Sequence, residues 1–561
     1  MKEDIALLLS KSTSLKKEEV IPLIEKPKNP EFGDYSFPCF ILAKKENRSP
    51  TEISKEIAAS LSSLKREEYE KIEAKGPYVN FFLSTSFLTK KVLKKVLTEK
   101  EKYGSCNMGE NKKVIIEFSS PNIAKPFGIG HLRSTIIGNS LSQIYSFLGF
   151  KVIKINYLGD WGTQFGKLLL GYQKFGSLQD FKKNPIKHLL EVYIKVNEDP
   201  SLEEEARKMF KKLELGDKKA LSLWKKFKKI SLKEFKKIYK NLNISFDVFS
   251  GESFYNEKIS EIELLLKQKN LLNESEGALI VDLENYNLGK CLIKKSDETT
   301  LYASRDIAAA IDRYNKYHFD KMIYEVGAEQ KLHFKQIFKI LELLGYSWAK
   351  DCLHVEHGLY LDKDGKKLAT RKGKTIFMED ILSETQKMAE EEVKKRFPKL
   401  SKKEILRRAK AIALAAIFYG DLKNYRANDI IFDIERFLSF EGDTGPYLLY
   451  SYARAKSILR KAKYSPKKEI IFPNEISDIE KRMLLHINSF QSEIENSLKT
   501  NNPSLIAHYA YSLSQIFNEF YHTQKVIGSE NQQFKLLLVG AFSQVLKNAL
   551  SLLGIRVLEK M

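Results

Sequence analysis

The sequence predicts a multidomain protein with a central α/β domain, a Rossmann-like, doubly wound parallel sheet, between an N-terminal α+β domain and a C-terminal all-α bundle. The chain has 561 residues, 43% of them hydrophobic, which is enough for three or four domains with buried cores. Strand-like and helix-like stretches alternate between about residues 112 and 380, as in doubly wound sheets. Beyond about 385 only helical patterns follow. We place the domains at 1–107, 108–384 and 385–561, with a helical insertion at about 173–247.

The charge balance favours a polyanionic partner. The formal net charge is +22, and 30% of the residues are charged, which suits RNA binding. A lysine-rich composition can also reflect genome-wide codon bias, so charge alone does not identify the partner.

The sequence indicates a protein of the reducing cytoplasm without membrane association. No run of residues is long and apolar enough to cross a bilayer, and the charged N-terminus lacks the organisation of a signal peptide. The cysteines are scattered without the paired spacing of metal ligands, so we expect neither zinc nor disulfides: Cys39, Cys106, Cys291 and Cys352.

Residues 1–107 are predicted to form a small α+β domain. Helical patterns near 1–12 and 50–63 flank the segment Asn29–Tyr35, and Tyr78–Leu83 has the aromatic and β-branched content of a strand. The pattern leaves open whether Tyr78 is a core aromatic residue or stacks on an unpaired base.

The stretch Val114–Thr135 has the features of a phosphate-binding turn. The run Val114–Ile116 predicts a buried strand, and apolar residues at helical spacing follow from Leu132. Gly128-Ile-Gly-His131 lies at the expected start of the helix, where unpaired amides and the helix dipole favour an anion. The glycines alone fit an ordinary strand-to-helix turn equally well.

The whole string decides between these interpretations, because it resembles the His-Ile-Gly-His signature of class I aminoacyl-tRNA synthetases. The flanking segments Ser119–Phe127 and Leu132–Thr135 resemble the arginyl-tRNA synthetases in particular. The resemblance covers essentially the whole chain. It implies an arginine–tRNA ligase that forms arginyl-adenylate from arginine and ATP and transfers the arginyl group to tRNA specific for arginine. Gly128 replaces the first histidine of the signature.

Further segments match the family's site. The predicted strand Val152–Tyr157 ends in Leu158–Gly166, which is similar to the family's Asp-Trp-Gly-x-Gln element beside the reacting centre. Tyr302 and Asp306 are four residues apart and share a helix face, and they match the Tyr-x-x-x-Asp element that holds the arginine side chain. Taken alone, such a pair usually lies exposed on a helix surface without a binding role. The segment Ile323–Gln330 matches the strand before the family's substrate-side glutamine, and nearby His333 is expected to be structural.

The insertion at about 173–247 is rich in lysine. Lysine pairs recur from Lys211–Lys212 to Lys236–Lys237, which is typical of a solvated helix face, and contact with the tRNA acceptor is the alternative. The segment Phe246–Ser253 then resembles a strand and turn whose Glu252 lies near the substrate pocket.

The second class I signature is present in altered form. Lys363–Thr375 lies where the family has its Lys-Met-Ser-Lys-Ser loop, with Lys367 at the first lysine and Thr370 at the second. By resemblance, Lys125 upstream of the first signature compensates for the missing lysine. Alone, the segment would be a basic surface loop; together with the first signature, it is a phosphate clamp.

The helical C-terminal part resembles the family's anticodon-binding bundle, although most of its apolar residues are core. Tyr521 and Met561 match positions that approach the anticodon loop. In the N-terminal domain, Tyr78 and Asn80 match positions that contact the D-loop of tRNA.

The resemblance therefore implies a full set of site residues. The predicted catalytic residues are Lys125, His131, Lys367 and Arg371. The predicted ATP-binding residues are Gly128, Gly130, His131, Asp160, His357 and Lys367. The predicted arginine-binding residues are Glu117, Asn122, Tyr302, Asp306 and Gln330, with Asp306 on the guanidinium, because a carboxylate can bind its planar fork through paired hydrogen bonds.

The expected reaction needs no enzyme nucleophile, since the arginine carboxylate attacks the α-phosphate of ATP in line. Catalysis is then positioning and stabilisation of charge on the phosphates. ATP is expected to bring Mg²⁺ as part of the substrate, with no zinc and no organic cofactor. The protein is expected to be a monomer and, as is usual in this family, to need bound tRNA before it activates arginine.

Two alternative functions remain. A non-catalytic RNA-binding relative is supported only by Gly128, and a class I synthetase of other specificity is disfavoured by Glu117, Tyr302 and Asp306. Arginine-dependent pyrophosphate exchange, with and without tRNA, distinguishes these possibilities.

Overall fold

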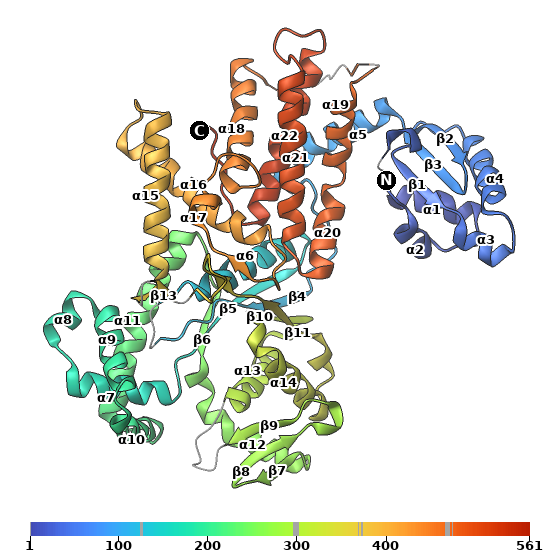
Figure 1. The fold of residues 1–561 in the computed structure, drawn as a ribbon. Helices are drawn as coiled ribbons and strands as arrows, with labels where there is room; N and C mark the ends of the chain where they lie inside the picture. The colour runs from blue at the N-terminus through green and yellow to red at the C-terminus, as the bar shows by residue number, and fades with distance from the viewer. Residues whose placement is uncertain are drawn as a thin grey trace. The chain divides into compact units, whose positions relative to one another are not determined.

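The computed structural model describes residues 2–27, 29–123, 127–294, 302–368, 370–371, 374–465, 472–473 and 475–561. In these ranges no helix has both the length and the apolar character needed to cross a membrane. The chain forms two compact units (Figure 1). The first comprises Met1–Tyr103, Ala455–Phe490 and Leu513–Val545, and the second comprises Gly104–Arg454, Gln491–Ser512 and Leu546–Met561.

The N-terminal part of the first unit is a small antiparallel sheet with helices. The strands have the order β1-β3-β2, and the helix α4 packs its apolar residues against β2 and β3. Its Ile53, Ile57 and Leu61 are buried because they recur at helical spacing. The bounds are α1 (Lys2–Ser12), α2 (Lys17–Val20), β1 (Tyr35–Pro38), α3 (Phe40–Glu46), α4 (Pro50–Ser62), β2 (Tyr69–Lys75), β3 (Tyr78–Leu83) and α5 (Thr85–Glu99).

A parallel five-stranded sheet forms the centre of the second unit. The strand order is β11-β10-β4-β5-β6. The chain therefore begins with the central strand β4, adds β5 and β6 on one side, and then adds β10 and β11 on the other side. This is a doubly wound sheet, which confirms the predicted fold class. The bounds are β4 (Lys113–Glu117), β5 (Lys151–Leu158), β6 (Val248–Gly251), β10 (Lys321–Gly327) and β11 (Cys352–His357).

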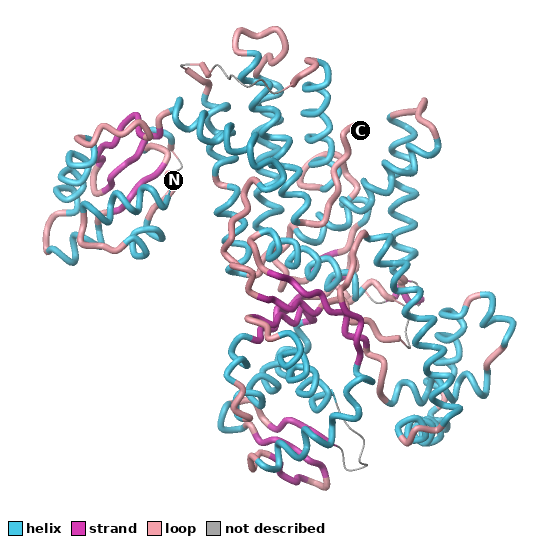
Figure 2. The backbone as a smooth tube through the Cα atoms, turned by 180° about the vertical axis from the view of Figure 1, so that it is seen from behind, coloured by secondary structure: helices cyan, strands magenta, loops and turns pink. Residues whose placement is uncertain are grey.

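Helices cover both faces of this sheet (Figures 1 and 2). Helix α6 (Gly130–Phe147) lies on one face, and α13 (Tyr302–Tyr317) and α14 (Lys331–Leu343) lie on the other. The residues of β4 between Lys113 and Glu117 are buried because β4 is the central strand. Gly138 lets α6 approach the sheet closely, since a Cβ there would lie 2.2 Å from the ring of Phe118.

Two insertions extend the second unit. The first, between β5 and β6, is helical, and the second contains a small antiparallel sheet, β7-β8-β9, that the sequence pattern did not predict. The bounds are α7 (Thr163–Phe175), α8 (Leu178–Lys183), α9 (Pro185–Asn197), α10 (Glu203–Glu214), α11 (Lys218–Leu242), α12 (Ile259–Gln268), β7 (Leu272–Ser275), β8 (Ala278–Asp282) and β9 (Lys290–Lys294).

The remaining elements are nearly all helical. Short strand pairs join β12 (Tyr360–Leu361) to β15 (Ile430–Ile431) and β13 (Thr370–Arg371) to β14 (Lys374–Thr375). The helices are α15 (Met378–Arg396), α16 (Lys402–Leu422), α17 (Ile434–Phe437), α18 (Gly445–Lys461), α19 (Asp478–Asn488), α20 (Phe490–Thr500), α21 (Ser504–Thr523) and α22 (Gln532–Leu552). The domain boundaries set from the sequence stay a prediction.

Candidate active site

Polar residues cluster where the five parallel strands end. Glu117 ends β4 and His357 ends β11, while Asp160, Glu252 and Gln330 follow β5, β6 and β10 within three residues. The carboxyl ends of parallel strands lie at one edge of the sheet, which is where ligands of doubly wound folds bind. The fold therefore gathers five polar residues from distant parts of the chain.

The first signature forms the start of α6. Gly130 is the first helical residue, and a Cβ at this position would have no neighbour within 4 Å. The backbone of Gly128 pairs with that of Phe377, and the His131 ring packs 5.4 Å from the ring of Phe127. The helix N-terminus is thus open to an anionic ligand beside an imidazole.

The described residues include only part of the predicted phosphate clamp. Lys125 lies outside them, and only the backbone of Arg371 is described. Lys367 is exposed, and its Nζ lies 2.9 Å from Oε1 of Glu329 in the turn after β10. This exposed ion pair joins the second signature loop to the turn after β10.

Contacts from α6 and α11 hold the loop after β4. Ser119 has a left-handed backbone with φ of 74°, a strained conformation for a residue with a side chain. Its backbone N–H donates to Oγ of Ser134 at 2.8 Å, and its hydroxyl lies 2.7 Å from that of Thr135 and 2.8 Å from that of Tyr239. Tyr239 also accepts a hydrogen bond from Asn156. The network stabilises the strained loop.

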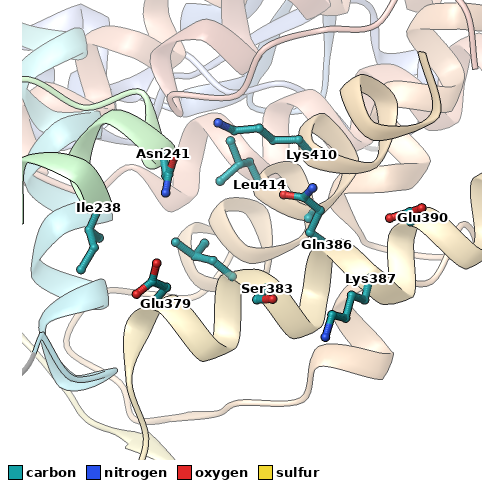
Figure 3. A pocket seen from close by; sticks show the side chains of 11 residues that line it. Ile238, Asn241, Glu379, Ser383, Gln386, Lys387, Glu390, Lys410 and Leu414 are labelled. Atoms are coloured by element: carbon teal, nitrogen blue, oxygen red, sulfur yellow. The ribbon is translucent and has the colours of Figure 1, made fainter. Parts of the chain in front are cut away.

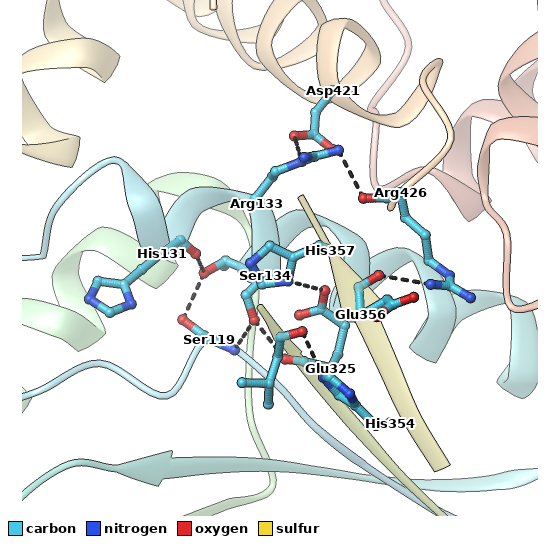
Figure 4. Close-up of polar contacts among 12 residues, drawn as sticks. Ser119, His131, Arg133, Ser134, Glu325, His354, Glu356, His357, Asp421 and Arg426 are labelled. Atoms are coloured by element: carbon cyan, nitrogen blue, oxygen red, sulfur yellow. Dashed lines mark hydrogen bonds and ion pairs between the residues drawn. The ribbon is translucent and has the colours of Figure 1, made fainter. Parts of the chain in front are cut away.

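Helix α6 is also anchored by a buried arginine that sequence patterns did not single out. Nε of Arg133 lies 3.3 Å from Oδ2 of Asp421 on α16, and its guanidinium donates to the carbonyls of Asn428 and Arg426 at 2.6 and 3.1 Å. Figure 4 shows the His131 ring and the Arg133 guanidinium on different sides of α6. One side of the helix is fixed, and the other faces the candidate site.

His357 lies at the edge of the sheet with a buried partner. Its Nδ1 is 2.8 Å from Oε1 of Glu325, whose side chain is fully buried (Figure 4). Hydrogen bonding at one ring nitrogen orients the imidazole and leaves Nε2 for another partner.

The predicted Tyr302–Asp306 pair lies on the first turns of α13. Oδ2 of Asp306 is 2.6 Å from Nε2 of His333, so Asp306 does not simply point into solvent. His333, expected to be structural, contacts a predicted substrate-binding residue. Tyr302 is 54% exposed.

Glu252 is buried and carries an oxygen without a hydrogen-bond partner among the described residues. Burial raises the pKa of Glu252 well above its ordinary value of 4.5; Arg305 opposes this rise, and Asp306 and Asp160 add to it. The buried hydroxyl of Tyr157 likewise lacks a partner in this part of the structure. A buried carboxylate oxygen without a hydrogen-bond partner is costly, which favours a site for a cationic group.

Glu117 is paired internally. Its Oε2 lies 2.5 Å from Nη2 of Arg313, and both side chains are almost completely buried. Burial raises the pKa of Glu117 although Arg313 favours its ionised form. The guanidinium of Arg313 also lies over the rings of Tyr157 and Tyr324, at 4.9 and 5.8 Å.

Asp160 makes contacts that the sequence did not predict. Oδ1 accepts from the N–H of Ser253 at 2.8 Å, and Oδ2 contacts the hydroxyl of Ser253 at 2.7 Å and Nζ of Lys228. Its carbonyl accepts from the indole of Trp224 on α11. Both carboxylate oxygens therefore have partners within the chain, and a role in binding ATP stays a prediction.

Asn122 and Gln330 lie on opposite sides of β4. Asn122 pairs with Gly159 in an isolated parallel bridge, and a Cβ at Gly159 would lie 1.8 Å from Oδ1 of Asn122. Only glycine fits there. Gln330 is exposed in the turn after β10.

The residues predicted to contact tRNA are not part of the five-stranded parallel sheet. In the first unit, Tyr78 packs edge-on against exposed Phe40 with ring centroids 5.8 Å apart, whereas Asn80 is buried and accepts from Ser36 at 2.7 Å. Tyr521, on α21 of the same unit, is 41% exposed.

Met561 belongs to the second unit. It lines a small cavity with α15, α16 and α18, among the residues Val393, Arg396, Phe397, Arg408, Ile412, Phe440 and Tyr450. The described residues contain no group of three or more His, Cys, Asp or Glu side chains arranged to hold a metal ion.

Three family descriptions match the chain in order. Residues 1–83 match "Arginyl tRNA synthetase N terminal domain", residues 92–434 match "tRNA synthetases class I (R), catalytic domain", and residues 448–561 match "DALR anticodon binding domain".

Individual proteins match over nearly the full length. The chain is 44% identical to the arginine–tRNA ligase of Clostridium perfringens, with 100% of both chains covered, and 46% identical to that of Streptococcus pneumoniae, with 98% and 97% covered. Among solved structures, arginyl-tRNA synthetase from Thermus thermophilus has a TM-score of 0.83 at 24% identity, covering 100% of this chain and 99% of that one. The enzyme from Plasmodium falciparum has a TM-score of 0.78 at 28% identity, covering 96% and 94%.

Proposed function

Because the chain belongs to the class I arginyl-tRNA synthetases and is an arginine–tRNA ligase, we propose that the carboxyl edge of its parallel sheet carries out both steps of that reaction. The first step joins arginine to ATP, and the second transfers the arginyl group to tRNA. The proposal assigns each part of the site to one of these ligands.

The acidic slot at the start of α13 binds the guanidinium of arginine. Two observations support this assignment: His333 orients Asp306 at 2.6 Å, and one buried oxygen of Glu252 has no hydrogen-bond partner among the described residues. Two carboxylates can satisfy a forked guanidinium, whereas the ammonium of lysine would leave hydrogen-bonding groups unpaired. Tyr302 covers the slot at its rim.

Glu117, Asn122 and Gln330 are assigned to the amino and carboxyl groups of arginine. Glu117 already neutralises Arg313. It therefore offers the substrate a fixed dipole and one remaining carboxylate oxygen, and not a full negative charge. Its contact with substrate stays a prediction, as do those of Asn122 and Gln330.

ATP binds over the start of α6. Gly128 and Gly130 let the triphosphate approach the helix N-terminus, where His131 donates to the phosphates. His357, held by Glu325, and Asp160 are assigned to the nucleoside side. Lys125, Lys367 and Arg371 are assigned to the departing pyrophosphate.

The carboxylate of arginine attacks the α-phosphorus of ATP, and pyrophosphate leaves in line. Protein groups act by positioning both substrates and by stabilising the phosphate charge. We propose that Mg²⁺ enters with ATP, since Mg²⁺ is usually bound by substrate phosphates and one or two carboxylates.

The tRNA assignments are Tyr78 and Asn80 for the D-loop and Tyr521 and Met561 for the anticodon loop. Exposed Tyr521 can stack on an unpaired base, and buried Asn80 can act only through a local rearrangement. A monomeric state and a cytoplasmic location also stay predictions.

An Asp306→Asn variant tests the arginine slot by tRNA-dependent ATP–pyrophosphate exchange. Losing one partner of a desolvated charge pair should raise the KM for arginine about 10²-fold and leave the KM for ATP within about threefold. Asp312→Asn is the matched control, because Asp312 lies on the same helix and pairs with Lys258. An unchanged KM for arginine would remove Asp306 from the slot.

A further inference from the structure

One face of helix α11 contacts the loops that follow three neighbouring strands of the parallel sheet. The residues on this face recur at intervals of three or four: Trp224, Lys228, Ser231, Phe235 and Tyr239. The hydroxyl of Ser231 donates to the carbonyl of Ile123 in the loop after β4 at 2.8 Å. The hydroxyl of Tyr239 lies 2.8 Å from that of Ser119 in the same loop. Trp224 and Lys228 contact the loops after β5 and β6, so that one helix of the insertion holds three loops of the candidate site.

Asp160 joins the loops after β5 and β6. Leu158 pairs with Gly251 where these strands end, so the two loops begin side by side. A Cβ at Gly251 would lie 2.6 Å from Oδ2 of Asp160, and glycine therefore leaves room for the carboxylate. The carboxylate accepts hydrogen bonds from both the N–H and the hydroxyl of Ser253, at 2.8 and 2.7 Å. Asp160 thus fixes the residue that directly follows Glu252.

Lys228 supplies the countercharge of Asp160. Its Nζ contacts Oδ2 of Asp160 and donates to the hydroxyl of Ser253 at 3.1 Å. The same Nζ lies 5.0 Å from the ring of Trp224, whose indole donates to the carbonyl of Asp160 at 2.8 Å. The Asp160 side chain is fully buried, whereas that of Lys228 is 26% exposed. Because a buried carboxylate is costly without a paired cation, Lys228 stabilises the whole cluster.

Glu252 lies beside this cluster. The charged and titratable groups that interact with its carboxylate belong to Arg305, Asp306, Asp160, Tyr157 and Tyr302. Burial raises the pKa of Glu252, the guanidinium opposes this rise, and the two aspartates add to it. Lys228 neutralises one of these aspartates, Asp160. Loss of Lys228 would therefore leave a negative charge beside a carboxylate that must be ionised to bind a guanidinium.

Core packing fixes α11 independently of Lys228. Phe227 and Phe235 on this helix are almost completely buried, and the ring of Phe235 packs 5.6 Å from that of Phe127. Near the end of the helix, Ile238 is buried and borders a hollow that α15 and α16 also line (Figure 3). Replacing Lys228 should therefore change the charge of the cluster without displacing the helix.

We propose that Lys228 is a positioning residue for arginine binding, which acts through Asp160 and Ser253 to hold Glu252 in the slot for the guanidinium. The inference rests on the proposed function, which places Glu252 in that slot. The positive charge of Lys228 carries the effect, because it neutralises Asp160 beside Glu252. Lys228→Arg should preserve this role, since a guanidinium also donates to a carboxylate.

The test compares four single variants of the full chain by tRNA-saturated ATP–pyrophosphate exchange. K228Q removes the charge of Lys228, and K228R keeps a cation at the same position. K229Q is the matched control, because Lys229 is the next residue on α11 and is exposed. S253A reaches the same cluster by a second route, since it removes the hydroxyl between Lys228 and Asp160 and retains both charges. Thermal unfolding verifies that each variant is folded, and the KM for arginine is followed across a pH series.

We expect K228Q to raise the KM for arginine about tenfold and to leave the KM for ATP within about threefold, because a residue without substrate contact acts only through the groups that it positions. K228R should stay within about threefold of the parent, and S253A should raise the KM for arginine severalfold. The control K229Q should change it less than about twofold. The pH above which arginine affinity rises should be higher in K228Q than in the parent, because the unpaired Asp160 disfavours ionised Glu252.

An unchanged KM for arginine in K228Q, an equal rise in K228R, or an unchanged pH profile would each overturn the proposal. A KM for ATP that rises as much as the KM for arginine, or more, would overturn it too, since Lys228 would then act on the ATP side or on the whole site. If K228Q does not fold, S253A decides in its place, and an unchanged KM for arginine in S253A would refute the positioning role. Failure of the parent protein to exchange pyrophosphate in the presence of arginine would instead refute the proposed function.

Discussion

Glu117 and Arg313 face one another across 2.5 Å in the interior, between the end of the central strand and the fourth turn of α13. Arg313 thus already contacts one oxygen of Glu117, a carboxylate that the sequence predicts to bind substrate arginine. Since α13 also carries Asp306, the pair links the wall of the arginine slot to the centre of the sheet.

Replacing one member of this ion pair should destabilise the protein more than replacing both members. Glu117→Gln leaves the buried guanidinium without a countercharge and should lower the free energy of unfolding by about 3–5 kcal/mol. The double variant Glu117→Met/Arg313→Met, which buries no charge, should lie within about 1 kcal/mol of the parent. Urea denaturation measures both. A single variant as stable as the double one would mean that the pair is not buried in solution.

Glu252 should make both stability and arginine binding depend on pH. Burial raises its pKa well above 4.5, so above pH 4.5 the unfolded chain loses a proton that the folded protein keeps. The stability from protonated Glu252 is present below pH 4.5 and is lost as the pH rises through the raised pKa. Arginine binds the ionised carboxylate, so its affinity should increase over the same interval.

The Glu252→Gln variant isolates this effect, because other buried carboxylates remain. Urea midpoints of parent and variant should converge at low pH, and the parent should lose stability relative to the variant as pH rises. The variant should also lose the pH dependence of arginine affinity, measured by calorimetry. Parallel stability profiles for the two proteins would show that Glu252 titrates normally.

Local sequence signals predicted those parts of the site that lie on one element. The strand and helix around Gly128–His131 follow from hydrophobic periodicity, and the shared face of Tyr302 and Asp306 follows from helix geometry. Contacts between distant segments carry no such signal. Nothing near Arg133 indicates that Asp421 neutralises it, since the pair exists only after α16 packs against α6.

The same limit applies to the contacts of two other residues. His333 is expected to be structural, and no local pattern indicates its contact with Asp306, because Asp306 lies on another helix. Asp160 was assigned to ATP by its motif, yet its contacts with Ser253 and Lys228 come from segments far along the chain. Partners from distant segments decide which polar residues are free to bind substrate. The hydrophobic periodicity of the sequence gives no information about these partners.

Tyr239→Phe tests whether α11 positions the loop after β4. The change removes the hydroxyl that meets Ser119 and Asn156 and keeps the ring packing. Leaving those buried groups without a partner should cost about 1–3 kcal/mol of stability and raise the KM for ATP severalfold. Tyr172→Phe on α7 is the matched control on a residue without a role in the loop. Urea denaturation and pyrophosphate exchange check the prediction, which an unchanged KM for ATP would contradict.

Gly128→His tests how the protein manages without the first histidine of the signature. An unreplaced transition-state donor would leave the parent about 10²-fold slower than it could be, and restoring the imidazole would recover that factor. We expect Lys125, His131 or a water to supply the contact already, so the variant should activate arginine within about fivefold of the parent rate. The backbone of Gly128 also pairs with Phe377, so Gly128→Ala controls for any disturbance of this pairing. Pyrophosphate exchange at saturating arginine, ATP and tRNA measures all three proteins, and an increase near 10²-fold in the histidine variant alone would show that the imidazole had never been replaced.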